Sequence, residues 1–137
     1  QIERKGIKFK YLILLQPTSP LRDNKNIEES CDTFLELEAD SLVSVARTDN
    51  AVLKTLTLNN KGFLKSAFDN NFPSMNRQEL PPAYRPNGAI YIIDKKLFIE
   101  NKNFLQSRTA MYEMEKNKII DIDSIEDINI IEEQNLI

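Results

Sequence analysis

The densest hydrophobic stretch of the chain is Tyr11–Leu15, five consecutive apolar residues. An apolar run without alternation is typical of a strand buried on both faces, as in parallel sheets covered by helices. Pro17 and Pro20 follow, and proline cannot donate to a sheet ladder, so the strand is expected to end before them. The polar loop after it would then lie at the carboxyl end of the strand, where ligands bind in open α/β sheets.

A helical pattern and a second strand come next. One apolar stripe at helical spacing is formed by Ile27, Cys31, Phe34 and Leu35. Asp23, Asn24 or Asn26 can cap this helix, and Cys31 is interpreted as core packing rather than as a nucleophile. Ser41–Arg47 is predicted to be a strand, so the order strand, helix, strand predicts a βαβ unit with parallel strands.

The middle of the chain has a hairpin pattern followed by a stretch without periodicity. Val52–Leu58 alternates, and the turn residues 59–62 lead into Phe63–Ala67. Residues 69–87 are irregular and contain Pro73, Pro81, Pro82 and Pro86. A long segment of this kind is usually functional or part of an interface.

Four further elements complete the pattern. They are a strand Ala89–Ile93, a short helix Asp94–Asn101, a strand Thr109–Met114 and a short strand end Ile119–Asp123. Ser124 is predicted to cap a last helix with Asp127 as its box partner. Its buried face would hold Ile125, Ile128 and Ile131. The whole pattern predicts an α/β fold with a mostly parallel sheet flanked by helices.

Composition restricts the possible partners and chemistry. The 137 residues carry a net charge of −3, so there is neither a basic footprint for nucleic acid nor a polybasic membrane patch. No apolar run approaches the roughly 20 residues of a transmembrane helix. A single cysteine excludes an internal disulfide and fits a reducing, cytoplasmic location. Because the chain has no histidine, its chemistry must use carboxylates, amides, hydroxyls, Lys, Arg or a hard metal ion.

Three segments carry polar groups suited to a site. In the first loop, the Gln16 amide both donates and accepts, Ser19 adds a hydroxyl, and Arg22 either binds an anion or covers the helix surface. In the second, the forks of Arg77 and Arg85 match a carboxylate. Asn87 either binds a ligand or, with Gly88, forms a turn with positive φ.

The third segment is Asp121-Ile122-Asp123. Alternation along an extended chain places both carboxylates on the same side. Two adjacent carboxylates repel each other and favour a shared hard cation such as Mg²⁺. The alternative is that they lie at a helix N-terminus and interact with its dipole.

All three segments resemble the acylneuraminate cytidylyltransferases, also called CMP-sialic acid synthetases. The matching motifs are Leu-Gln-Pro-Thr-Ser-Pro-Leu-Arg at 15–22, the Arg-Gln…Asn-Gly segment at 77–91 and the Asp-x-Asp segment at 120–127, in the family's order. The resemblance implies a Rossmann-like nucleotidyltransferase sheet and a Mg²⁺-dependent transfer of CMP from CTP to a sialic-type nonulosonic acid, with release of pyrophosphate. It assigns catalysis and Mg²⁺ to Asp121 and Asp123.

The resemblance also implies how the sugar acid is held. The substrate-binding residues would be Gln16, Ser19, Arg22, Lys54, Arg77, Gln78 and Asn87. Around Lys54 the sequence departs from the family's His-Pro-containing pattern, so a solvated strand lysine is an equal interpretation. The excursion at about residues 50–87 would mediate a homodimer.

The family's Gly-rich loop for the CTP phosphates has no counterpart here, because Gly6, Gly62 and Gly88 are isolated. We therefore expect residues 1–137 to form the C-terminal part of a single cytidylyltransferase domain, with an apolar sheet edge open to another chain. One alternative is a non-catalytic fragment that keeps the sugar half-site and the dimer surface. Another is a nucleotidyltransferase of the same fold that acts on an eight-carbon acid. The choice among sialic, legionaminic and pseudaminic acids is open.

Overall fold

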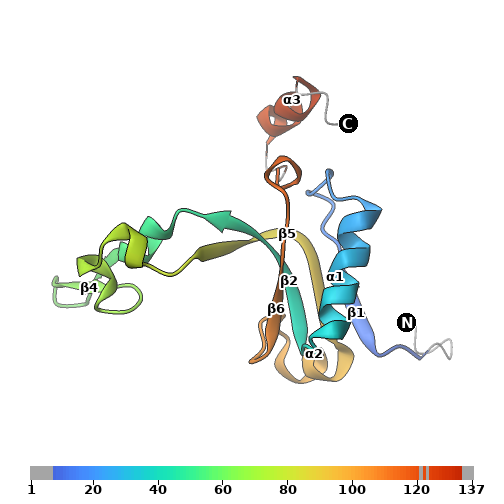
Figure 1. Ribbon diagram of the computed structural model, residues 1–137, viewed down its shortest axis with the longest axis horizontal. Helices are drawn as coiled ribbons and strands as arrows, with labels where there is room; N and C mark the ends of the chain where they lie inside the picture. The colour runs from blue at the N-terminus through green and yellow to red at the C-terminus, as the bar shows by residue number, and fades with distance from the viewer. Residues whose placement is uncertain (1–7, 121, 123, 134–137) are drawn as a thin grey trace. The chain divides into compact units, whose positions relative to one another are not determined.

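The chain forms two compact units in the computed structural model, which describes residues 8–120, 122 and 124–133 (Figure 1). The main unit is Gln1–Ala46 with Pro86–Ile137, and the excursion unit is Arg47–Arg85. Strands β2 (Ser41–Thr48) and β5 (Ala83–Asp94) carry the chain into and out of the excursion unit. None of the helices in the described part has the length and apolar character needed to cross a membrane.

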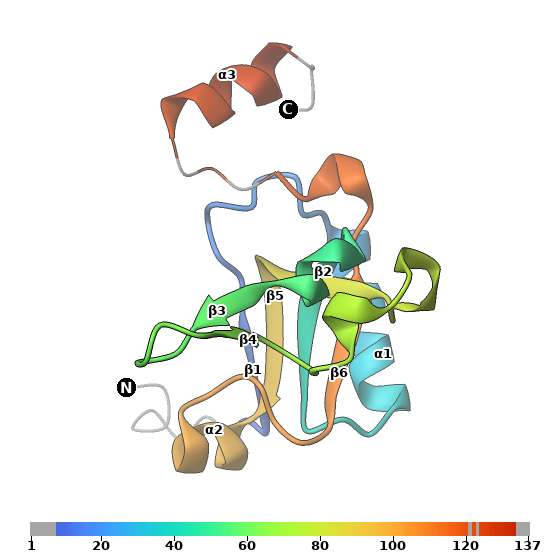
Figure 2. The same cartoon turned by 90° about the vertical axis from the view of Figure 1, so that its left-hand side faces the viewer.

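The main unit is built on a four-stranded sheet in the order β1-β5-β2-β6, seen side by side in Figure 2. Strand β1 (Tyr11–Leu14) is antiparallel to β5, and β2 is parallel to β6 (Thr109–Glu113). The backbone N–H of Asp94 donates to the Asp40 carbonyl at 3.1 Å, which places the end of β5 beside the start of β2. Strand β5 therefore runs opposite to both of its neighbours.

The sheet is mixed, which corrects the prediction of a mostly parallel sheet, although β1 and β2 do run parallel as the predicted βαβ unit requires. Strands β1, β2 and β6 share one direction, but β5 lies between β1 and β2. The physical reason is the connection between β2 and β5. It contains no crossover helix, and without one a returning strand pairs in the antiparallel sense.

Burial differs most from the prediction at the first strand. All residues from Ser41 to Ala46 of β2 are buried, as expected for a strand covered on both faces. In contrast, Ile13 of β1 is 46% exposed, and Leu14 and Leu15 are also exposed. The prediction that Tyr11–Leu15 is buried on both faces is wrong, because β1 is an edge strand among the described strands. The expected apolar sheet edge is therefore present in this part of the chain.

Helix α1 (Asn24–Glu36) begins where the sequence predicts a cap. The Asp23 carboxylate accepts from the Asn26 N–H at 2.9 Å, and the Asn26 side chain accepts from the Asp23 N–H at 3.1 Å. Phe34 is buried, and its ring packs edge-to-face against the ring of Tyr11, with the ring centroids 5.1 Å apart. The central hydrophobic cluster consists of Phe34, Leu42, Ala89, Ile90, Ile92 and Met114, with Ile27 and Cys31 packed against it. Leu35 is 54% exposed, so the predicted apolar stripe does not include it.

The two remaining α-helices of the described part also begin at side-chain caps, of which only the one at Ser124 was predicted. Helix α2 (Lys95–Asn101) follows Asp94, whose carboxylate accepts from the Lys96 N–H at 2.7 Å. Helix α3 (Ile125–Glu133) follows Ser124, whose N–H donates to the Asp127 carboxylate at 2.8 Å, as the predicted box requires. On α3, Ile131 is buried as predicted, but Ile125 is 74% exposed and Ile128 is exposed as well.

The segment before α3 forms no strand in its described part, contrary to the predicted strand end Ile119–Asp123. Residues Lys116–Lys118 form a 3-10 helix instead. Asp121 and Asp123 lie outside the described residues.

The excursion unit contains the predicted hairpin in a shorter form. Strands β3 (Leu56–Leu58) and β4 (Leu64–Ser66) pair antiparallel, and the turn uses Gly62 at φ +80°. The predicted strand Val52–Leu58 is wrong in its first half, where Asn50–Lys54 forms a 3-10 helix. The Asp49 carboxylate accepts from the Ala51 N–H at 2.9 Å and so turns the backbone out of the extended conformation.

The stretch predicted to be irregular contains short ordered elements. Phe72–Ser74 and Arg77–Glu79 are 3-10 helices, and β5 begins at Ala83 rather than at Ala89. A capping box orders the second of these turns, with the Asn76 N–H donating to Glu79 at 2.8 Å.

Candidate functional site

The loop 16–22 of the main unit is held against strand β5 by one side chain. Arg22 Nη1 donates to the Gln16 carbonyl at 3.0 Å and to the Ala89 carbonyl at 2.8 Å. The same guanidinium nitrogen thus joins the start of the loop to the strand that carries Asn87. Both bonds are charge-assisted, so they are stronger than ordinary hydrogen bonds. In this structure Arg22 orders the loop.

Asn87 lies at a distortion of β5 made by Gly88, which has φ +79°. The prediction of positive φ at this pair is therefore confirmed, and the distortion occurs within a strand rather than in a turn. Asn87 Oδ1 accepts from Ser44 Oγ at 2.6 Å and from the Ala89 N–H at 3.3 Å. The amide nitrogen Nδ2 is buried and has no hydrogen-bond partner among the described residues.

Ser19 presents a second buried polar atom of this kind. Its side chain is buried in the loop, and its Oγ has no partner in the described part of the chain. Buried polar side chains are nearly always hydrogen-bonded, so each exception needs an explanation. The two exceptions fall on residues that the sequence assigned to sugar binding. Within the main unit, Arg22 links the loop that holds Gln16 and Ser19 to β5, the strand of Asn87.

Ser44 is the residue of this site that the sequence reasoning missed. It is fully buried, and its Oγ contacts both Asn87 and the backbone N–H of Ile90, the latter at 2.7 Å. A signal was present in the sequence, because small hydroxyl residues interrupt an otherwise apolar strand at Ser41 and Ser44. Buried hydroxyls require partners, so such positions mark polar contacts within a core.

Ile122 and Lys118, near the C-terminal end of the described residues, contact the loop 16–22 and the cap of α1. The N–H of Ile122, the residue between Asp121 and Asp123, donates to the Thr18 carbonyl at 2.8 Å. Upstream, Lys118 Nζ forms an ion pair with the Asp23 carboxylate at 2.6 Å. The hydrogen bond from Lys118 and then that from the Asn26 N–H hold the pKa of Asp23 below its usual value. In return, the hydrogen bond to Asp23 raises the pKa of Lys118.

The metal site predicted from the sequence rests on residues outside the described ranges. Within those ranges, no three acidic or cysteine side chains are arranged to hold a metal ion. The paired carboxylates of Asp121 and Asp123 have the donor chemistry that Mg²⁺ prefers. The metal assignment therefore remains a prediction that fits the donor set.

On the excursion unit, two side chains next to the end of β2 hold the turn that carries Arg77. Arg77 Nη2 forms an ion pair with Asp49 Oδ2 at 2.7 Å. Asn50 Nδ2 donates to the carbonyls of Arg77 at 3.1 Å and Leu80 at 3.4 Å. Asp49 and Asn50 were not identified from the sequence as part of a site. Their position after a strand was the available signal, because such residues order turns.

A small cavity of about 190 Å³ adjoins this turn, and Arg47 and Arg77 are among the residues that line it. Among the other predicted residues of the excursion unit, Lys54 donates from Nζ to the Met75 carbonyl. Gln78 is exposed, and so is Arg85 at the start of β5.

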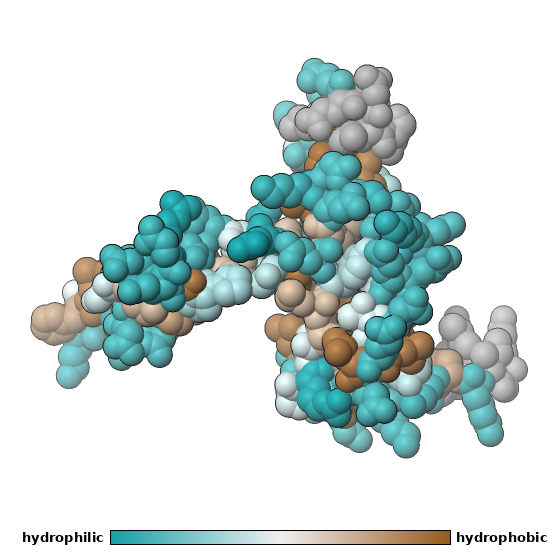
Figure 3. All heavy atoms as spheres, in the orientation of Figure 1, coloured by the Kyte–Doolittle hydropathy of each residue, from teal (hydrophilic) through white to brown (hydrophobic). Residues whose placement is uncertain are grey.

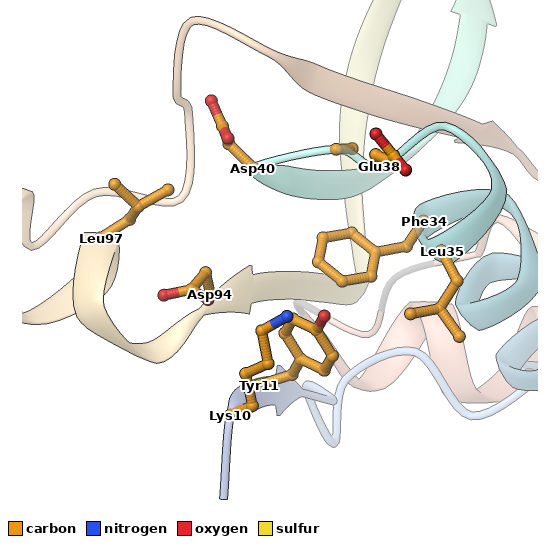
Figure 4. A pocket seen from close by; sticks show the side chains of 9 residues that line it. Lys10, Tyr11, Phe34, Leu35, Glu38, Asp40, Asp94 and Leu97 are labelled. Atoms are coloured by element: carbon orange, nitrogen blue, oxygen red, sulfur yellow. The ribbon is translucent and has the colours of Figure 1, made fainter.

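A cavity of about 380 Å³ lies at the opposite end of β1 from the loop (Figure 4). Its lining combines the rings of Tyr11 and Phe34 with charged groups. The charged residues are Lys10, Glu38, Asp40 and Asp94. Because it opens beside the start of β1, it is separate from the predicted site.

The comparisons with known proteins agree with the motifs. No protein-family model matches the chain. It is 35% identical over 115 residues to the N-acylneuraminate cytidylyltransferase of Streptococcus agalactiae serotype III (strain NEM316), covering 84% of this chain and 28% of that protein. It is 33% identical over 123 residues to the N-acylneuraminate cytidylyltransferase of Escherichia coli O18:K1:H7, and this match covers 89% of this chain and 29% of that protein.

A more distant match extends the comparison to a second sugar acid. The pseudaminic acid cytidylyltransferase of Campylobacter jejuni serotype O:2 is 21% identical over 120 residues, covering 88% of this chain and 51% of that protein. The chain thus spans well under two thirds of the length of these relatives. It is a homologue of the N-acylneuraminate cytidylyltransferases that corresponds to a part of them.

Proposed function

We propose that this chain provides the sugar-acid-binding part of an enzyme that transfers CMP from CTP to a sialic-type nonulosonic acid and releases pyrophosphate. The observation that carries the proposal is that two buried polar atoms, Ser19 Oγ and Asn87 Nδ2, have no hydrogen-bond partner within the described ranges. They lie in two of the three motifs shared with the cytidylyltransferases. In such a site a ligand would supply the missing hydrogen bonds.

The chemistry of the main unit suits a polyhydroxylated acid. Asn87 Nδ2 can only donate, Ser19 Oγ can donate or accept, and the Gln16 amide can do both. These groups match the hydroxyl and acyl-amide oxygens of a sugar. Arg22 keeps its guanidinium on the Gln16 and Ala89 carbonyls, so its role in this proposal is to fix the loop that presents the other groups.

On the excursion unit, the resemblance assigns Arg77 and Gln78 to sugar-acid binding, and we propose a carboxylate as their ligand. Arg77 carries a planar fork suited to a carboxylate, and Gln78 beside it is exposed. Asp49 already occupies one edge of the Arg77 guanidinium. A ligand carboxylate would therefore compete with Asp49 or bind the free edge. Lys54 is a weaker candidate, because its ammonium is bonded to the Met75 carbonyl.

In the proposed reaction the anomeric hydroxyl of the acid attacks the α-phosphorus of CTP, and the bond to the β-phosphate oxygen breaks. Asp121 and Asp123 would hold Mg²⁺, which supplies charge neutralisation at the phosphates when it is bound. The contribution of Gln16, Ser19 and Asn87 is to orient the anomeric hydroxyl. Positioning of this kind accounts for much of the catalysis in phosphoryl transfer.

The excursion unit is also proposed as the surface of a homodimer. Leu56, Leu58 and Leu64 share one face of the β3–β4 hairpin, since Leu58 is opposite Leu64 and two residues after Leu56. All three are exposed, and Figure 3 shows hydrophobic atoms on this unit. A two-stranded sheet is marginally stable by itself. Packing this face against a second copy would bury the apolar surface.

Turnover tests the proposed reaction directly. In a full-length context, with Mg²⁺, CTP and N-acetylneuraminic acid, phosphorus NMR should show pyrophosphate and the phosphodiester of a CMP-sugar. Asp121→Ala should abolish both signals while sugar binding is largely kept. Turnover unchanged in this variant would contradict the metal assignment. Turnover of an eight-carbon sugar acid, with none of N-acetylneuraminic acid, would favour the alternative nucleotidyltransferase of the same fold.

A second candidate is a non-catalytic sugar-acid binder. The observation that favours it is the isolation of the glycines, since no Gly-rich phosphate cradle occurs in the sequence. Calorimetry separates the candidates. Binding of the sugar acid without binding of Mg·CTP would support the binder, whereas binding of both ligands would support the enzyme.

A further inference from the structure

Ser44 forms two hydrogen bonds that fix the orientation of the Asn87 amide. The backbone N–H of Ile90 donates to Ser44 Oγ at 2.7 Å, which uses one lone pair of that oxygen. The hydroxyl hydrogen of Ser44 is then available for the atom 2.6 Å away on Asn87. The hydroxyl therefore acts as acceptor toward one strand residue and as donor toward the other.

The second neighbour of the amide removes the remaining ambiguity. The side-chain oxygen of asparagine accepts hydrogen bonds, whereas its nitrogen donates them. A 180° flip of the amide exchanges the two atoms, so that a donor would stand where an acceptor is needed. The backbone N–H of Ala89 can only donate, and it lies 3.3 Å from the same Asn87 atom. Two donors thus converge on one atom, which must be Oδ1. The nitrogen Nδ2 is directed away from both donors and is left buried, with no partner in the part of the chain that the structure describes.

We infer that Ser44 is a positioning residue for ligand binding, which holds the Asn87 amide so that Nδ2 donates to an acceptor oxygen of the bound acid. The inference rests on the proposed function for the identity of the ligand. Without the Ser44 hydroxyl, Oδ1 keeps only the long bond to Ala89, and the amide can turn. A turned amide would present an acceptor to the ligand oxygen, and the two would repel.

The chain contains a matched control on the same strand. Ser41 is also fully buried on β2, and its Oγ forms a 2.8 Å bond with Thr109 Oγ1. Ser41→Ala therefore deletes a buried hydroxyl bond of β2 without touching Asn87. If the effect of Ser44→Ala were merely structural, both variants would show the same loss of function at similar loss of stability.

The first measurement needs no ligand. The side-chain amide of Asn87 gives a pair of resonances in ¹⁵N-correlated NMR spectra, assigned by their loss in Asn87→Ala. Ser44→Ala should shift or broaden this pair, and Ser41→Ala should leave it in place. An unchanged pair in Ser44→Ala would overturn the inference whether or not a sugar acid binds.

The second measurement is a cycle of affinities for N-acetylneuraminic acid by calorimetry. Asn87→Ala and Ser44→Ala should each raise Kd about tenfold, the range of one lost hydrogen bond, and the double variant should be no weaker than Asn87→Ala. Ser41→Ala should bind like the wild type. Additive losses in the double variant, or equal losses in the two serine variants, would overturn the inference.

Failure of the proposed function has a different signature. If the wild type binds no sugar acid, the proposed function and the ligand of this inference both fall, whatever the NMR result. If the wild type binds and Asn87→Ala does not weaken binding, the role of Asn87 falls and that of Ser44 with it. If Asn87→Ala weakens binding but the losses of affinity in Ser44→Ala and Asn87→Ala are additive, the proposed function stands and this inference falls.

Discussion

Arg22 Nη1 lies 2.8 Å from the carbonyl oxygen of Ala89, and this bond connects the loop after β1 to the central part of β5. A second bond from the same nitrogen reaches Gln16 at the start of the loop. The loop is therefore closed on itself and attached to the sheet by one cation. Because Ala89 is two residues from Asn87, the same contact fixes the two motifs relative to each other.

Removal of this clamp should cost stability and sugar affinity together. Arg22→Ala should lower the free energy of unfolding by about 2 kcal/mol, the range for hydrogen bonds from a charged group in a partly buried place. Arg22→Lys keeps a charged donor nitrogen but on a shorter side chain, so it should recover only part of the loss. Urea denaturation measures both variants. A loss below about 0.5 kcal/mol in Arg22→Ala would show that the clamp does not order the loop.

Two adjacent residues of α1 should respond very differently to truncation. Phe34→Ala should destabilise the chain by about 3–5 kcal/mol, since it removes a buried ring from the core. Leu35→Ala should change stability by at most about 0.5 kcal/mol, because Leu35 is exposed. Thermal or urea unfolding gives the comparison. Equal losses would mean that Leu35 is covered in solution and that the helix faces the core differently.

Because of the Asp23–Lys118 ion pair, we expect the stability of the folded chain to depend on pH in the acid range. Its hydrogen bonds lower the pKa of Asp23 in the folded chain, so they stabilise the chain above the unfolded pKa of about 4. That contribution is lost as pH falls through the lower folded value. Asp23→Asn keeps a capping side chain but cannot ionise, so its unfolding midpoint should fall less steeply below pH about 4. Parallel acid profiles for the two proteins would contradict this account.

The partner group acts at the other end of the pH scale. The pKa of Lys118 is raised in the folded chain, so its contribution is complete below the unfolded pKa of about 10.4 and is lost as pH rises through the folded value. The pair should therefore contribute constantly between about pH 5 and 9. Melting temperatures of Lys118→Met and wild type should differ by the same amount across this window.

The exposed face of the β3–β4 hairpin should control the oligomeric state. Leu58→Asp places a charge among the exposed leucines and should shift the chain from dimer to monomer in sedimentation experiments. Thr57→Asp is the matched control, since Thr57 is also exposed and points to the other side of the hairpin. A monomeric wild type, or dissociation by both variants alike, would argue against a dimer through this face.

Local patterns predicted most of the elements, and the exceptions have identifiable causes. The caps at Asp23 and Ser124 and the hairpin turn at Gly62 follow from side-chain chemistry within a few residues. The burial of the first strand could not be predicted in this way. The run at Tyr11–Leu15 has the composition of a buried strand, but exposure depends on which strands lie beside it, and that is a long-range property.

The direction of β5 and the clustering of site residues also depend on long-range contacts. Nothing local to Ala83–Asp94 specifies that it inserts between β1 and β2, because its partners lie far away in the sequence. The motifs include Ser19 and Asn87, which hold the buried polar atoms that have no partner among the described residues. They did not identify Ser44 as the neighbour of Asn87, or Asp49 as the partner of Arg77, since both contacts are made across the fold.

The most direct test of the central claim is a calorimetric titration of the chain with N-acetylneuraminic acid, in parallel with its legionaminic and pseudaminic counterparts. We expect saturable binding of at least one of these acids, with affinity lost in Asn87→Ala and retained in Ser41→Ala. The absence of binding for all three acids, or binding that is indifferent to Asn87→Ala, would contradict a sugar-acid site in this part of the molecule.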